Sequence, residues 1–288
     1  MNTNAARSSS TEVEFVVLGR RIAAKRWGTV GGAPTLALHG WLDNANSFDV
    51  LAPMLQKLDL VALDFAGHGH SDHRPPGINY FGLLDVQDVM AVANQLGWER
   101  FNIIGHSMGA EVGGNLLGLF PERVPRLACI DGFPEGCSEA RVLDAYRNSI
   151  QLNLTKASHP GKVFTTRAAM AERVAEATGQ SLHSAELLVA RGTREVVDGF
   201  MWQSDPRVRW GDTLRVADEQ LDGILARYEG RILIVAAQEG AKWYRESVTS
   251  RCTRFANMTM VEVPGNHHLH MDDTAVRVAE LINGFLAE

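Results

Sequence analysis

The chain has 288 residues, of which 45% are hydrophobic, and a formal net charge of −6. This length and composition allow one large folded domain or a core domain with an insertion, and they argue against a disordered chain. Because lysine and arginine residues form no cluster, binding to nucleic acid or to an anionic membrane is not expected.

The N-terminal residues and the cysteines give expectations about the compartment. Residues 1–10 lack the basic start and apolar stretch of a secretory signal, and no apolar run approaches membrane-spanning length, so we expect a cytoplasmic protein without a membrane partner. The three cysteines, Cys129, Cys137 and Cys252, are odd in number and lack metal-ligand spacing. Free thiols are expected, with neither a disulfide framework nor a metal site.

The first half of the chain alternates between strand and helix patterns after a disordered lead predicted over residues 1–11. In chain order the predicted elements are an edge hairpin (14–18 and 22–27), a buried strand (35–38), a helix (47–58), a strand (60–65), a helix (80–96), a strand (101–104), a helix (108–120) and a strand (127–130). This order predicts a parallel sheet with right-handed crossovers.

The alternation stops after Asp131. Residues 134–222 contain helical stretches at 139–152, 166–178 and 184–191 and no clear buried strand, so they are predicted to form a helical cap. The alternation then resumes with a strand (232–237), a helix (243–255), a strand (258–263) and a helix (274–286). The predicted domain division is therefore a core of residues 12–133 and 223–288, interrupted by the cap.

Polar residues follow most of the predicted strands, and parallel sheets bind ligands at the carboxyl ends of their strands. These residues are His39, Asp64, Ser107, Asp131, Gln238, Glu239 and His267. The sequence predicts that they gather along one edge of the sheet, where their convergence points to an active site.

The strongest candidate for a nucleophile is Ser107, in the segment Gly105-His106-Ser107-Met108-Gly109 between a predicted strand and a predicted helix. A serine on a tight strand-to-helix turn needs small residues two positions away on each side, because the strained backbone leaves no room for larger side chains. The turn also places Ser107 at a helix N-terminus, where free amide groups stabilise negative charge.

A serine nucleophile needs a base, and His267 is the best candidate because it follows the last strand on a glycine-containing loop. His268 and His270 compete with it for this role. The histidine cluster also suggests metal binding, but no matching ligand set on another element supports a metal site.

The acid that orients the base is less well defined. In this architecture it often follows the strand at residues 232–237, where the expected position is occupied by Gly240 and Glu239 lies one residue earlier. Asp131 follows the neighbouring strand and can approach the same histidine. We favour Asp131 and keep Glu239 as the alternative, because the chemistry requires only that the imidazole be oriented.

An oxyanion hole requires two N–H donors, for which the backbone amides of Met108 and Trp41 are predicted. His39 is expected to brace the loop that carries Trp41. The segment from Asp64 to Ser71 has two glycines at turn positions and is predicted to be a structural loop.

Together these segments resemble the α/β-hydrolase superfamily and, within it, the serine hydrolase-like proteins. The resemblance is carried by residues 38–45, 64–71, 105–109, 112–114, 188–196 and 261–267. It implies an α/β-hydrolase fold with a mostly parallel eight-stranded sheet, helices on both faces and a helical lid. It also implies an ester-hydrolysing enzyme of carboxylesterase type that uses no cofactor, with Ser107 as nucleophile and His267 as base.

The expected reaction is hydrolysis of small or medium acyl esters through an acyl-enzyme. Apolar candidates for the walls of the substrate pocket are Trp41, Phe133, Phe164, Met201 and Trp202. The alternatives are hydrolysis of a thioester, a lactone or a carbon–carbon bond, and a small-molecule receptor with a vestigial hydrolase site. The fold alone does not choose among these functions. The partner expected is a small-molecule ester, and the chain is expected to be a monomer or a homodimer.

Overall fold

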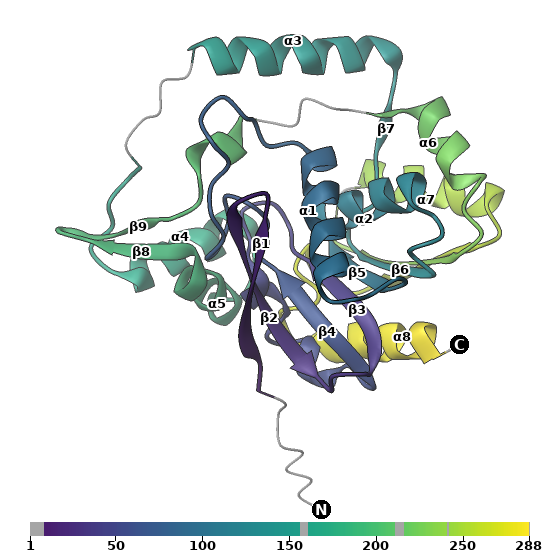
Figure 1. Ribbon diagram of the computed structural model, residues 1–288, viewed down its shortest axis with the longest axis horizontal. Helices are drawn as coiled ribbons and strands as arrows, with labels where there is room; N and C mark the ends of the chain where they lie inside the picture. Colours follow the sequence, from purple (N-terminus) through teal and green to yellow (C-terminus); the bar gives the residue numbers. More distant parts are fainter. Residues whose placement is uncertain (1–8, 156–160, 211–215, 241, 288) are drawn as a thin grey trace, which may run out of the picture.

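An eight-stranded, mostly parallel sheet forms the centre of the computed structural model, which describes residues 9–155, 161–210, 216–240 and 242–287 (Figure 1). The strand order is β1-β2-β4-β3-β5-β6-β11-β12. The strands are β1 (Thr11–Val17), β2 (Arg20–Gly28), β3 (Ala33–Leu38), β4 (Leu58–Leu63), β5 (Asn102–His106), β6 (Arg126–Ile130), β11 (Arg231–Ala237) and β12 (Met258–Val263). The predicted α/β fold class is confirmed.

The predicted edge hairpin is confirmed as β1 and β2, which pair antiparallel. Its turn places Leu18 and Gly19 at positive φ angles of 50° and 76°, the backbone twist that tight hairpins favour. Of the disordered lead predicted over residues 1–11, residues 1–8 lie outside the described residues, and Thr11 already belongs to β1.

Helices cover both faces of the sheet because the central strands are apolar on both sides. Along β3, Leu36 and Leu38 pack toward one face and Ala37 packs toward the other. The first face is covered by α1 (Gly82–Gln95), α2 (Met108–Leu119), α6 (Asp218–Leu225) and α7 (Lys242–Arg254). The second face is covered by α8 (Ala275–Ala287) and by the 3-10 turns η1 (Ala45–Phe48) and η2 (Ala52–Met54).

The predicted helix over residues 47–58 is wrong, since η1 and η2 replace it. Both are held by bonds from residue i+3 to residue i, including Met54 N–H to the Leu51 carbonyl (3.0 Å). Pro53, in the first turn of η2, has no N–H to donate to a continuous α-helix across this segment. Helical spacing alone did not reveal this interruption.

The cap contains α3 (Glu139–Thr155), which lies away from the sheet at the top of Figure 1, and the helix pair α4 (Arg167–Thr178) and α5 (Leu182–Gly192). It also contains strands, which corrects the expectation of a purely helical cap. A hairpin joins β8 (Thr193–Val196) to β9 (Gly199–Trp202), and β7 (Gly136–Cys137) pairs with β10 (Val216–Ala217). These strands are too short for their periodicity to identify them in the sequence.

The predicted boundary between cap and core, at residues 222 and 223, falls inside α6. Leu221 and Leu225 are buried in the same apolar cluster as the inward sides of α1 and α2. The whole of α6 therefore packs with the core. None of the described helices is long and apolar enough to cross a membrane.

The carboxyl ends of six neighbouring strands lie at one edge of the sheet, as predicted. The parallel register pairs Leu38 with Leu63, His106 with Ile130, and Ala237 with Val263. The residues that follow these positions, including Ser107 and Asp131, are thus brought to the same edge.

Candidate active site

Ser107 lies on a strained turn between β5 and α2, with φ 49° and ψ −116°. For a residue other than glycine such a backbone costs on the order of 1–3 kcal/mol and marks functional sites. A Cβ at Gly105 would lie 2.5 Å from the Ala110 amide nitrogen, and one at Gly109 would lie 2.0 Å from the Leu38 carbonyl oxygen. Both positions therefore require glycine, as the sequence predicts.

A third glycine that the sequence analysis did not single out also shapes this turn. A Cβ at Gly132 would lie 2.5 Å from the Cα of Ser107. The Ser107 amide in turn donates a hydrogen bond to the Ile130 carbonyl (3.0 Å). The turn is therefore packed against the chain that leaves β6.

The loop after β3 lies directly against the Ser107 turn. A Cβ at Gly40 would lie 2.7 Å from Nδ1 of His106, and one at Gly109 would lie 2.8 Å from the His39 carbonyl oxygen. The backbone at Trp41 is therefore a close neighbour of the turn. Among the described residues, neither the Trp41 nor the Met108 amide has a hydrogen-bond acceptor, so both donors are free for a ligand.

His39 braces this loop, as predicted. Burial lowers the pKa of its imidazole to about 3, so the ring is neutral near neutral pH. Nδ1–H donates to the Gly40 carbonyl (2.7 Å), and Nε2 accepts from the Phe65 amide (3.0 Å). With both nitrogens used inside the fold, His39 has no free group for chemistry.

The His267 imidazole forms a 2.6 Å hydrogen bond with Asp131, from Nδ1 to Oδ2. The Asp131 side chain is 3% exposed, while that of His267 is 42% exposed and accessible from solvent. The other carboxylate oxygen of Asp131 accepts from the Ala237 amide at 2.8 Å. The carboxylate is thus fixed between strands β6 and β11 and directed at the ring.

Glu239, the alternative acid, makes no such contact. Its side chain is exposed, its amide donates to the Gly265 carbonyl (3.1 Å), and its carboxylate has no hydrogen bond to His267 within the described part of the chain. The expected acid position is Gly240, where a Cβ would lie 3.0 Å from Oδ2 of Asp131. The carboxylate of Asp131 therefore occupies the space next to Gly240.

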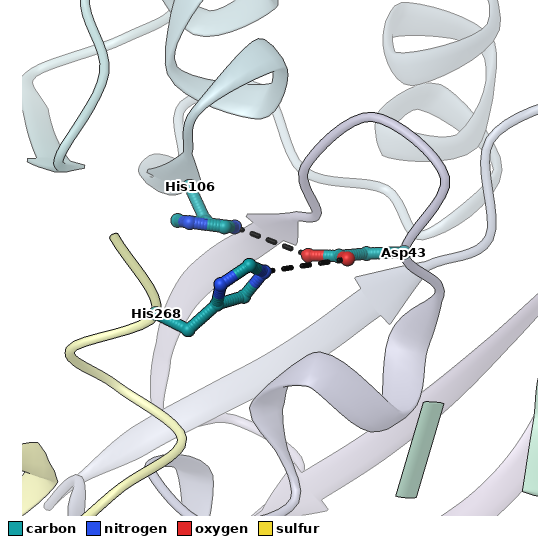
Figure 2. Close-up of side chains that lie close together, drawn as sticks. All are labelled: Asp43, His106 and His268. Carbon is teal, nitrogen blue, oxygen red and sulfur yellow. Dashed lines mark hydrogen bonds and ion pairs between the residues drawn. The ribbon is translucent and has the colours of Figure 1, made fainter. Parts of the chain in front are cut away.

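The two histidines that competed with His267 lie in the interior. His268 Nε2 faces Oδ1 of Asp43 at 3.7 Å (Figure 2), and His270 forms a 2.7 Å hydrogen bond with the Ser47 hydroxyl. Both rings are buried. Only His267 of the three has a largely accessible side chain.

One cluster in the described residues has spacing suited to a cation. Ligand atoms of Asp43, His106 and His268 lie within 4.8 Å of one another, and all three residues are buried. The sequence analysis did not identify this set, because the three residues are far apart in the chain and only the fold joins them.

A buried ion pair joins the cap to the loop after β4. Asp64 is fully buried and accepts two contacts from Nε of Arg191, at 3.0 and 2.8 Å. It also accepts from the amides of Ala45 (2.7 Å) and His70 (2.8 Å). The contacts of Asp64 are therefore all made within the fold, which supports a structural role for this residue.

The opposite end of α5 is attached to the loop that carries the base. The Ser184 hydroxyl contacts the Met271 carbonyl at 2.9 Å and the Asp272 carboxylate at 2.5 Å. Asn266 donates to the Gly179 carbonyl in the turn before α5 (2.9 Å). The cap and the His267 loop thus share several hydrogen bonds.

Replacing Arg191 with methionine should lower the free energy of unfolding by about 3–5 kcal/mol, because it leaves the buried Asp64 carboxylate without its partner. Burial already raises the pKa of Asp64, and the Arg191 charge opposes that rise. Urea denaturation measures the change. Arg194→Met, at an exposed position, is the control and should shift stability by less than ~0.5 kcal/mol. Equal effects of the two changes would contradict a structural role for the ion pair.

The predicted pocket residues lie in two different environments. Phe133 is 2% exposed and belongs to the main core, not to an open wall. Phe164 and Trp202 pack against the small apolar cluster of the cap, and Met201 lies beside them on β9. The three cap residues therefore remain candidates for the pocket wall. Phe133 is too deeply buried in the core to be one.

An open cavity of about 510 Å³ lies along the β1–β2 hairpin, next to segment 69–73 and the cap hairpin. Its walls are mainly charged, including Glu12, Arg21 and Arg194. Neither Ser107 nor His267 lines it. It is therefore separate from the candidate active site.

Comparison with known proteins agrees with this geometry. The sequence profile of the alpha/beta hydrolase fold family matches residues 34–274. The chain belongs to this family, the α/β hydrolases.

Within the family it is one of the serine hydrolase-like proteins. It is 34% identical to Serine hydrolase-like protein 2 of Homo sapiens, over 99% of this chain and 97% of the human protein. It is 32% identical to a Serine hydrolase-like protein of Danio rerio, over 99% and 90% of the two chains. A crystal structure of a hypothetical protein from Pseudomonas aeruginosa PAO1 superimposes with a TM-score of 0.90 at 36% identity, covering 96% of this chain and 99% of that one. The family relationship supports a hydrolase.

Proposed function

We propose that the protein hydrolyses carboxylic esters through an acyl-enzyme, with Ser107 as nucleophile, His267 as base and Asp131 as the acid that orients the base. The observation that carries this proposal is the 2.6 Å hydrogen bond from His267 to a buried Asp131, next to a serine on a strained turn. Backbone contacts join these parts, since the Ser107 amide donates to the residue that precedes Asp131.

In the first half of the reaction, His267 accepts the proton of the Ser107 hydroxyl as Oγ attacks the ester carbonyl. Asp131 holds the Nδ1–H tautomer, which leaves Nε2 as the basic nitrogen. The amides of Trp41 and Met108, which have no acceptor among the described residues, stabilise the oxyanion of the tetrahedral intermediate. The alcohol then leaves with the proton that His267 returns to it.

In the second half, His267 accepts a proton from water, which attacks the acyl-enzyme through a second oxyanion. Collapse of this intermediate releases the acid and restores Ser107. No step needs a cofactor, because the chain's own groups supply the nucleophile, the base and the oxyanion donors.

The cap supports a small or medium acyl ester as the substrate. Phe164, Met201 and Trp202 provide apolar surface on the cap, and the Trp41 indole, 52% exposed, adds a further apolar wall beside the proposed oxyanion donor. Its Nε1–H donates to the cap at the Val208 carbonyl (2.9 Å). Apolar surface of this kind suits an apolar acyl group.

The proposal is tested with two measurements on the purified protein. Incubation with a fluorophosphonate should add one phosphonyl group, located at Ser107 by peptide mass spectrometry. A panel of p-nitrophenyl esters, thioesters and lactones of graded chain length should give the highest kcat/KM with short or medium esters. Preferential turnover of a thioester or lactone would change the substrate class. The absence of both labelling and turnover would contradict a serine hydrolase.

A further inference from the structure

The side chains of Asp43, His106 and His268 come from three different segments of the chain and lie close together (Figure 2). Asp43 follows the loop that carries Trp41, His106 directly precedes Ser107, and His268 directly follows His267. His106 Nδ1 lies 3.2 Å from Oδ2 of Asp43, and His268 Nε2 lies 3.7 Å from Oδ1. One carboxylate thus contacts the immediate neighbours of the nucleophile and of the base.

The cluster carries charge in the interior. Asp43 is 6% exposed, and in the described part of the chain no lysine or arginine pairs with it. Burial opposes its ionisation, yet hydrogen bonds from His106 and His268 hold the pKa of Asp43 well below its usual range. Burial also opposes the charged form of His268, but Asp43 raises the pKa of this imidazole above 6.5. The position of His268 beside Asp43 therefore favours the charged form of this imidazole.

His106 connects this pair to the base. Burial lowers its pKa to about 4, so the ring is neutral near neutral pH. Its Nδ1 lies 3.2 Å from Oδ2 of Asp43, and its Nε2 lies 3.0 Å from the carbonyl oxygen of His267. Both partners are acceptors and a neutral ring has one N–H, so the ring donates to one of them at a time. The His106 and His267 ring centroids are 4.8 Å apart. A movement of His106 would therefore displace both the Ser107 turn and the backbone of the base.

We propose that Asp43, His106 and His268 are positioning residues that hold three segments in their catalytic arrangement: the loop of the oxyanion donor, the nucleophile turn and the loop of the base. This inference rests on the proposed function. The link is the buried Asp43 carboxylate, which lies 3.7 Å from Nε2 of His268 and 3.2 Å from Nδ1 of His106. Nε2 of His106 in turn lies 3.0 Å from the His267 carbonyl oxygen. None of the three residues touches the reacting atoms in this scheme.

The far side of the His268 ring does not favour a metal ion in this cluster. A histidine that binds a metal generally donates its other ring N–H to a nearby acceptor. His268 Nδ1 is buried and has no hydrogen-bond partner among the described residues. Stoichiometric zinc in the purified protein, with activity lost on chelation, would show that Asp43 and His268 bind a metal ion and do not form an ion pair with each other.

The proposal gives a definite pH dependence. Because the folded-state pKa of His268 is raised above its unfolded value, its stabilising effect is complete below about pH 6.5 and is lost as the pH rises through the raised value. The rings of His106, His267 and His270 lie beside this ring, and Asp131 and Asp272 act on it from farther away. Both acids favour the charged form of His268, as Asp43 does, so stability is still expected to fall as the pH rises.

The test compares Asp43→Asn and His268→Gln with the wild type, using p-nitrophenyl butyrate. Misalignment of the three segments should lower kcat by about 10–100-fold while KM changes by less than about threefold. In the wild type, the free energy of unfolding in urea should fall on the alkaline side. In His268→Gln this alkaline decrease should disappear. His183→Gln, at an exposed position on the cap, should behave as the wild type in both measurements.

Unchanged kcat in both cluster variants, or an alkaline decrease in stability that persists in His268→Gln, would overturn the proposal. If Asp43→Asn fails to fold, the measurements on His268→Gln still test the proposal. The outcome is also separable from that of the proposed function. A wild type that hydrolyses no ester would refute the proposed function, while the pH dependence of unfolding would still test the charged pair.

Discussion

Replacing Ser107 with alanine should lower kcat/KM for p-nitrophenyl butyrate by roughly 10⁴-fold or more, to a residual rate that comes from binding and the oxyanion donors. The loss should be this large because the acyl-enzyme cannot form without the Ser107 hydroxyl. Initial rates at 405 nm, measured at protein concentrations high enough to detect the residual rate, give the ratio. Alanine keeps the Cβ and has a similar volume, so the backbone strain at this position is unchanged and the variant should be about as stable as the wild type.

Ser250→Ala is a suitable control, because Ser250 is an exposed residue of α7. This variant should keep the wild-type rate, which shows that losing a serine hydroxyl does not by itself matter. A Ser107→Ala protein that still hydrolyses the ester at more than a tenth of the wild-type rate would refute Ser107 as the nucleophile.

Replacing Asp131 with asparagine should lower kcat by about 10⁴-fold, the loss expected when the acid of such a triad becomes an amide. The amide NH₂ would face Nδ1 of His267, so the ring would turn its other tautomer toward the serine and lose its basic Nε2. The amide oxygen can still accept from the Ala237 amide, which now donates to the carboxylate at 2.8 Å. The fold should therefore survive, and circular dichroism and urea denaturation check that it does.

Glu239→Gln is the matched comparison, because it makes the same chemical change at the alternative acid. Its exposed side chain predicts activity within about twofold of the wild type, as for most surface substitutions away from a site. Loss of turnover in Glu239→Gln, with activity retained in Asp131→Asn, would assign the acid to Glu239.

The sequence predicted the sheet well because its strands carry strong local signals. Continuous apolar runs such as Leu60–Leu63 identify strands buried on both faces, and turn residues such as Gly19 mark the hairpin. The cap was predicted less well. Its strands β8 and β9 are four residues each, which is too short for alternation to stand out, and the interruption at Pro53 was hidden by helical spacing on either side.

The candidate site was partly predictable for the same reason. Ser107 lies between two glycines, and His267 follows the last strand, so local patterns identify both. The partnership of Asp131 with His267 spans 136 residues and needs the strand order to be recognised. Arg191, Gly132 and Asp43 act through contacts with distant segments, and nothing in their immediate sequence distinguishes these contacts.

Helix α5 is fastened at both of its ends. Ser184 near its start is bonded to Met271 and Asp272, and Arg191 near its end is paired with Asp64. A segment anchored twice in this way cannot swing outward as a rigid flap without breaking a buried ion pair. In the proposed mechanism we therefore expect substrate entry and product release to depend on other parts of the cap, while α5 keeps its place next to the loop that carries His267.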